Sequence, residues 1–75
     1  MKTELENASG IFGNRLKFLR SEKQLSQKQV ADRLDVAVNT YANWEQGRRE
    51  PGIIDIYKII SALEVLPNDL FGDDI

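Results

Sequence analysis

The sequence contains no cysteine and no histidine. Without cysteine it has no disulfide, no thiolate nucleophile and no thiolate-bound metal, and without histidine it has neither a Ser-His-Asp triad nor an imidazole ligand. A chain of 75 residues forms one domain with a single modest core, in which a deep catalytic pocket is not expected. These absences predict a protein that is not an enzyme and that needs no cofactor or metal.

Long apolar runs are also missing. The unbroken apolar pieces, such as Ile53-Ile54 and Ile59-Ile60, span a few residues, whereas a membrane-spanning helix needs about 18. Lys2 is followed by mostly polar residues and not by the apolar segment of a secretory signal. We therefore expect a cytoplasmic protein with no membrane partner.

Charge is distributed unevenly along the chain, although the net charge is only −2. Residues 1–10 carry a net charge of −1, residues 11–24 of +3, residues 25–49 of +1 and residues 50–75 of −5. A polyanion is therefore expected to contact the first two-thirds of the fold. The acidic last third is expected to face away from it and to limit non-specific affinity.

Apolar spacing predicts an all-α domain over residues 11–71, between a flexible arm at residues 1–10 and an acidic tail at residues 72–75. The arm has few apolar residues and no helical period, and it ends in Ser9-Gly10. Within the domain we expect five helices and no strand. They run from Ile11 to Lys23, from the Ser26 cap to Leu34, from about Val38 to Gly47, from Ile53 to Leu63, and over residues 67–71.

Each predicted helix has an apolar face or a terminal signal. Ser26 is a good N-cap, Gly47 suits a left-handed C-terminal position, and Pro67 suits the first position of a helix. The expected inward residues are Phe12, Leu16 and Leu19, then Val30, Ala31 and Leu34, then Tyr41 and Trp44, and finally Ile53, Ile56, Ile59, Ile60 and Leu63.

Two short helices separated by a tight break, between Ser26 and Gly47, have helix-turn-helix spacing. The segments Leu25-Ser-Gln-Lys-Gln-Val-Ala-Asp-Arg-Leu34 and Tyr41-Ala-Asn-Trp-Glu-Gln-Gly47, followed by Pro51, resemble the phage-repressor and xenobiotic-response-element family of lambda-repressor-like helix-turn-helix proteins. The resemblance covers residues from about 11 to 71. It implies a compact five-helix lambda-repressor-like fold that binds double-stranded DNA and regulates transcription.

The resemblance also implies which residues contact DNA. Gln27 is expected to bond a phosphate with its amide, at the positive end of the helix dipole. Val38, Asn39 and Asn43 are expected to face base edges in the major groove. Asn suits adenine and Val38 suits a thymine methyl, which favours A·T pairs in the half-site. A helix cap or a solvated amide is the alternative interpretation of Asn39, and a solvated amide that of Asn43.

Three further residues are candidates for phosphate contacts. Arg48 and Arg49 follow the recognition helix, where two guanidinium groups can hold a phosphate, and Thr40 can reach the DNA backbone. A solvated charged loop is the alternative for the arginines. A bond to its own helix carbonyl is the alternative for Thr40.

In the family, an arginine near the end of the first helix pairs beneath the surface with a glutamate near the end of the recognition helix. Arg20 and Glu45 hold those positions here. If the pair is buried, it holds the recognition helix to its scaffold, and if it is exposed, Arg20 is one more phosphate ligand. Tyr41 and Trp44 lie on the face opposite the asparagines, so we expect them in the core and not stacked on bases.

Two residues depart from the family pattern. Asp35 stands where a turn glycine is common, and aspartate tolerates the left-handed region better than most residues. Ala37 stands where serine or threonine usually caps the recognition helix. If Asn39 caps the helix instead, base contacts shift toward Asn43.

A dimer is expected because one helix-turn-helix unit covers only a half-site. Ile54, Tyr57, Leu66 and Pro67 are apolar residues near the C-terminal end with no evident internal partner, and we predict that they form a small dimer interface. The nearby acidic residues repel across such a contact, so the homodimer is expected to be weak alone and stronger on a two-fold symmetric operator.

The leading interpretation is a sequence-specific transcriptional regulator, expected to be a repressor. The alternative is a protein-interaction module, such as the antitoxin of a toxin–antitoxin pair, whose partner surface would be the acidic C-terminal third. The net charge slightly favours this alternative, whereas the basic front half, Gln27 and the Arg48-Arg49 pair favour DNA more strongly. For an enzyme, Asp69, Asp73 and Asp74 offer carboxylates to a cation, but no base, nucleophile or phosphate-binding glycine loop accompanies them.

Overall fold

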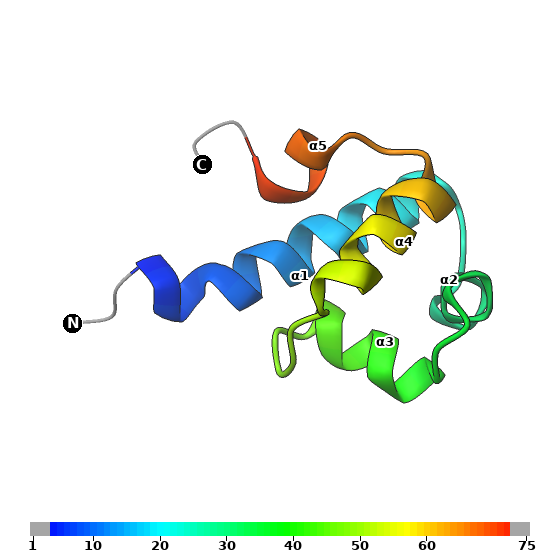
Figure 1. The fold of residues 1–75 in the computed structure, drawn as a ribbon, viewed down its shortest axis with the longest axis horizontal. Helices are drawn as coiled ribbons and strands as arrows, with labels where there is room; N and C mark the ends of the chain where they lie inside the picture. Colours follow the sequence, from blue (N-terminus) through cyan, green and yellow to red (C-terminus); the bar gives the residue numbers. More distant parts are fainter. Residues whose placement is uncertain (1–3, 73–75) are drawn as a thin grey trace.

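The computed structural model describes residues 4–72, and over that range it has five helices and no strand. They are α1 (Glu4–Glu22), α2 (Gln27–Leu34), α3 (Val38–Glu45), α4 (Ile53–Leu63) and α5 (Pro67–Phe71). The long α1 runs along the molecule, and it packs against α3 on one side and α5 on the other (Figure 1). α2 packs against α3 and α4. The predicted all-α fold is confirmed.

The first helix begins earlier than predicted. Residues 4–10, expected to belong to a flexible arm, are helical, while residues 1–3 of that arm and 73–75 of the acidic tail lie outside the described residues. The prediction relied on apolar periodicity, and these turns extend beyond the apolar core. Gly10, read as the end of the arm, lies inside α1, where the loop at Gly47 packs against its backbone.

The core contains the inward residues predicted for four of the helices, with one exception. Its buried members are Leu16, Val30, Ala31, Leu34, Tyr41, Trp44, Ile59, Leu63 and Leu70. The other predicted inward residues, Phe12, Leu19, Ile56 and Ile60, are partly buried and pack against this cluster. Ile53 was expected in the core but is 69% exposed. It is the first residue of α4, where the helix has just left the loop, and the apolar face reaches the core only from Ile56 onward.

The ends of α2 have the predicted chemistry. The Ser26 hydroxyl accepts a hydrogen bond from the backbone N–H of Gln29, and the Gln29 side chain accepts one from the Ser26 N–H. This reciprocal capping satisfies two backbone donors at the helix start. At the other end, Asp35 adopts a left-handed conformation with φ of +58°, so the turn into α3 forms without a glycine.

Gly13 and Gly47 allow the backbones of α1 and of the end of α3 to approach closely. A Cβ atom on Gly13 would lie 2.5 Å from the Glu45 carbonyl oxygen and 2.6 Å from that of Trp44. After α3 the chain turns at Gly47, which has a φ of +74° and lies against the backbone of Gly10. The helix that carries the predicted base contacts is therefore held against α1 by direct backbone packing.

Within residues 4–72, no helix combines the length and the apolar content that crossing a bilayer requires.

Substitution of the two α1 glycines is expected to have opposite effects. Gly13→Ala should lower the free energy of unfolding by about 1–3 kcal/mol or more, because the new methyl group meets rigid backbone. Gly10→Ala should leave it unchanged or raise it by up to about 1 kcal/mol, because a Cβ there meets nothing within 4 Å and alanine favours helix. Urea denaturation measures both. Equal effects would contradict the close approach of α1 and α3.

Candidate nucleic-acid interface

Helix α3 presents one polar face to solvent and one apolar face to the core. Asn39 is exposed and Asn43 is half-buried, whereas Tyr41 and Trp44 are buried, as predicted. Val38 is exposed and Thr40 is half-buried. The two asparagines are four residues apart and lie on one side of the helix, from which amide groups can reach a ligand.

The start of α3 settles the open question about its cap. Ala37 is the N-cap residue and makes no side-chain hydrogen bond, so the departure from the family pattern leaves the helix uncapped there. The helix nevertheless begins at Val38, which places Asn39 inside its first turn. Asn39 therefore does not cap the helix, and its exposed amide stays available.

Gln46 was missed by the sequence analysis. It is exposed directly after α3, three residues beyond Asn43 and seven beyond Asn39. Helical spacing of three and seven places a residue on the same face. The same counting that linked the asparagines would have found it.

A buried ion pair joins α1 to the end of α3. Arg20 Nε lies 2.6 Å from Glu45 Oε2, and Arg20 Nη2 lies 3.1 Å from Glu45 Oε1. The guanidinium also donates from Nη1 to the Leu25 carbonyl at 2.8 Å. Glu45 is only 5% exposed. The Arg20 guanidinium is therefore bonded to groups within the fold, and its alternative role as a surface phosphate ligand is not supported.

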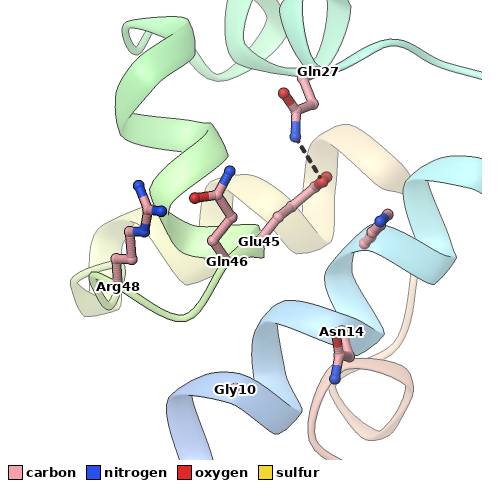
Figure 2. A pocket seen from close by; sticks show the side chains of 7 residues that line it. Gly10, Asn14, Gln27, Glu45, Gln46 and Arg48 are labelled. Carbon is pink, nitrogen blue, oxygen red and sulfur yellow. Dashed lines mark hydrogen bonds between the residues drawn. The ribbon is translucent and has the colours of Figure 1, made fainter.

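Glu45 also holds the first residue of α2. Gln27 Nε2 donates to Glu45 Oε1 at 2.9 Å (Figure 2). One carboxylate therefore receives bonds from both α1 and α2. An amide nitrogen carries two N–H groups, and one remains for another acceptor. The predicted phosphate ligand Gln27 is thus oriented by a residue of α3.

Opposing effects determine the pKa of Glu45. Burial alone would raise the pKa of its carboxyl, but the hydrogen bonds from Arg20 and Gln27 outweigh burial and lower it below its ordinary value. The same bond to Glu45 raises the pKa of Arg20. Burial raises the pKa of the neighbouring Tyr41 hydroxyl, and Glu45 raises it further. That hydroxyl, which has no hydrogen-bond partner within the described residues, therefore stays neutral beside the ion pair.

Beside this ion pair lies a polar hollow of about 490 Å³ between α1, the start of α2 and the end of α3. Figure 2 shows Gly10 and Asn14 on one side of it, Gln27 above, and Gln46 and Arg48 on the far side. The full lining consists of Gly10, Asn14, Lys17, Gln27, Glu45, Gln46 and Arg48. Of the four predicted phosphate ligands, the hollow brings Gln27 and Arg48 together, whereas Thr40 and Arg49 do not line it.

The predicted dimer residues are exposed on α4 and at the start of α5. Ile54, Tyr57 and Leu66 are 64%, 65% and 68% exposed, and Pro67 is exposed beside Leu66. Ile53, wrongly assigned to the core, adds to the exposed apolar surface at the start of α4. Large apolar side chains at this exposure are available for contact with another surface.

Removal of the buried carboxylate is expected to destabilise the fold in a pH-dependent way. At neutral pH, Glu45→Ala should lower the free energy of unfolding by about 3–5 kcal/mol, because the Arg20 charge is then buried without a partner. Because the folded-state pKa of Glu45 is depressed, its contribution is complete above the unfolded pKa of about 4.3 and is lost as pH falls through the folded value. The difference between wild type and variant should therefore shrink in acid.

Asn43→Ala serves as the comparison, since Asn43 lies on the outward face of the same helix. Thermal denaturation between pH 7 and pH 3 measures all three proteins. Equal melting temperatures of the two variants at pH 7, or a difference between wild type and Glu45→Ala that does not change with pH, would contradict the buried ion pair.

Comparison with known proteins identifies the family. A family model described as a helix-turn-helix domain matches residues 13–72. The control protein C.MunI of a Mycoplasma species is 38% identical over 63 residues, which cover 83% of this chain and 85% of the relative. The cryptic phage CTXphi transcriptional repressor RstR of Vibrio cholerae is 30% identical over 63 residues, 84% of this chain and 57% of its own length.

A solved structure agrees with the fold described above. The restriction-modification controller protein C.AhdI of Aeromonas hydrophila superimposes with a TM-score of 0.79 at 34% identity, covering 83% of this chain and 94% of that protein. The matched region includes both helices between Gln27 and Glu45 and the α1 segment that packs on them. The chain therefore belongs to the helix-turn-helix family of DNA-binding transcription regulators, of the lambda-repressor-like type.

Proposed function

We propose that this chain is a sequence-specific repressor that places α3 in the major groove of double-stranded DNA and binds a two-fold symmetric operator as a dimer. The observation that supports the proposal most directly is the division of α3 into two faces. Its inward residues are buried in the core, and its outward residues include two amides held on a rigid helix. A duplex-reading helix needs this combination of fixed position and exposed hydrogen-bonding groups.

Base recognition is assigned to Val38, Asn39 and Asn43. An asparagine amide donates to N7 of adenine and accepts from its N6 amino group, and an exposed valine contacts the methyl group of thymine. All three residues are at least partly accessible in the free protein. This set favours a half-site that contains A·T pairs.

Phosphate contacts are assigned to Gln27, Thr40, Arg48 and Arg49. Gln27 stands at the first position of α2, where the helix dipole favours an anion, and the arginines follow α3 in an exposed loop. Gln27 and Arg48 line the same hollow, which is consistent with one stretch of DNA backbone passing over both. These contacts position the protein and do not read sequence.

The names of relatives support a role in transcriptional control. RstR is named a transcriptional repressor, and C.AhdI is named a restriction-modification controller protein. For this chain we propose repression by occupancy of an operator. The dimer is assigned to the exposed patch of Ile54, Tyr57, Leu66 and Pro67, which would supply the second half-site contact.

The DNA-binding proposal predicts different effects for base and phosphate ligands. Asn39→Ala and Asn43→Ala should each reduce the preference for operator over unrelated duplex by about 1–3 kcal/mol, because a base-specific amide is lost. Gln27→Ala should weaken binding to both duplexes alike. Gel shifts at two salt concentrations, with the region upstream of the chain's own gene and a scrambled duplex of equal length, measure both effects.

Melting temperatures of the variants separate lost contacts from lost folding. Wild-type protein that shows no salt-dependent binding to any duplex would contradict DNA binding itself. Asparagine variants that keep the full preference for the operator would contradict only the groove assignment.

The dimer proposal predicts that Leu66→Glu disrupts self-association. We expect wild type to form a weak dimer, in the micromolar range or above, that becomes stable on operator DNA, because a small patch supplies little binding energy. Leu66→Glu places like charges across the two-fold axis and should sediment as a monomer and lose cooperative operator binding. Ser21→Glu, an exposed site on α1, is the matched charge control. Unchanged cooperativity in Leu66→Glu would place the interface elsewhere.

A further inference from the structure

The hollow beside Glu45 has a wall that the proposed DNA contacts do not use. Gln27 and Arg48 line it from the start of α2 and from the loop after α3, and α1 contributes Gly10, Asn14 and Lys17. Asn14 and Lys17 are exposed and lie one helical turn apart on α1. The hollow therefore has an amide and an ammonium group on a helix that carries no assigned DNA contact.

The hollow is electropositive even though Glu45 lines it. The Glu45 carboxylate is balanced by Arg20 and also accepts from Gln27, so its charge is compensated within the fold. In the part of the chain that the structure describes, the ion pairs are Arg20–Glu45 and Lys28–Asp32, and neither includes Lys17 or Arg48. Lys17 and Arg48, neither of which has an ion-pair partner among those described side chains, therefore face one hollow from α1 and from the loop after α3.

The remaining lining also suits an anion. Gln27 keeps one amide N–H beyond its bond to Glu45, and Asn14 and Gln46 add two more side-chain amides that can donate. A phosphodiester carries one negative charge on two oxygens, and it is bound in proteins by lysine, arginine and amide donors of this kind. The hollow lies beside the end of α3, so a phosphate is a better fit there than a base edge.

We propose that Lys17 and Asn14 of α1 bind a phosphate of the DNA backbone seated in this hollow, together with Gln27 and Arg48. The inference rests on the proposed DNA binding and extends the interface to the first helix. The phosphate bridges α1 to the start of α2 and to the loop after α3. Glu45 of α3 bonds Gln27, which lines the hollow. A phosphate bound in the hollow therefore fixes how α3 is placed relative to the DNA backbone.

The first experiment compares Lys17→Gln with Lys23→Gln, which removes the same charge at an exposed site outside the hollow. The logarithm of the binding constant is measured against the logarithm of salt concentration, for operator and for scrambled duplex. Lys17→Gln should reduce the magnitude of the slope by about 0.9, equally for both duplexes, because one phosphate contact is lost. Lys23→Gln should leave the slope close to that of wild type.

The second experiment tests Asn14 with a charge placed in the hollow. Asn14→Asp should weaken both duplexes more than Ser21→Asp, which lies seven residues further along the same side of α1 but outside the hollow. All four sites are exposed, and matched melting temperatures show that the fold is kept.

The outcomes separate this inference from the function on which it rests. If wild type binds DNA and the hollow variants behave like their matched controls, the α1 contact is wrong and the proposed function stands. If wild type binds no duplex at any salt concentration, both are wrong. A loss confined to the operator would place Lys17 at a base and overturn the phosphate assignment.

Discussion

The buried carboxylate of Glu45 is the constraint on which the arrangement of the first three helices depends. A charge at 5% exposure is tolerated only with a partner, and Arg20 of α1 provides it. Gln27 of α2 donates to Glu45 Oε1, the carboxylate oxygen that also accepts from Arg20 Nη2. One side chain at the end of α3 thus determines where α1 and α2 stand. Directional bonds to one carboxylate specify the relative positions of these helices more narrowly than apolar packing alone.

Backbone packing adds a second constraint at the same place. The approach of α1 to the last carbonyls of α3 is so close that only glycine fits at residue 13, and the following loop turns at Gly47 against Gly10. The polar bonds set the relative positions of the helices, and the glycines let the backbones come near enough for those bonds to form. The polar hollow lies between the helices that these two constraints hold in place, namely α1, the start of α2 and the end of α3.

Much of this fold could be predicted from the sequence, because local signals specify local structure. Helical spacing located α2 to α5, and Ser26, Gly47 and Pro67 marked their ends. The failures lie where a local signal was absent or continued past the core. The first turns of α1 carry no apolar period, and Ile53 continues an apolar pattern beyond the point where the core ends. In the candidate site, the Arg20–Glu45 pair followed from the family resemblance. The bond from Gln27, the role of Gly13 and the α1 wall of the hollow depend on how helices meet, which spacing along one helix does not report.

The two faces of α3 also bear on how such a protein changes over time. Tyr41, Trp44 and Glu45 are buried and contribute to the stability of the domain, whereas Asn39 and Asn43 of the same helix, and Gln46 directly after it, lie on the outward side. Because the two sets alternate along one short helix, mutations in the outward set can accumulate without unfolding the protein. If the outward residues read DNA as proposed, a duplicated copy can acquire a new target through a few surface substitutions while its core stays the same, and the outward face can be redesigned in the same way.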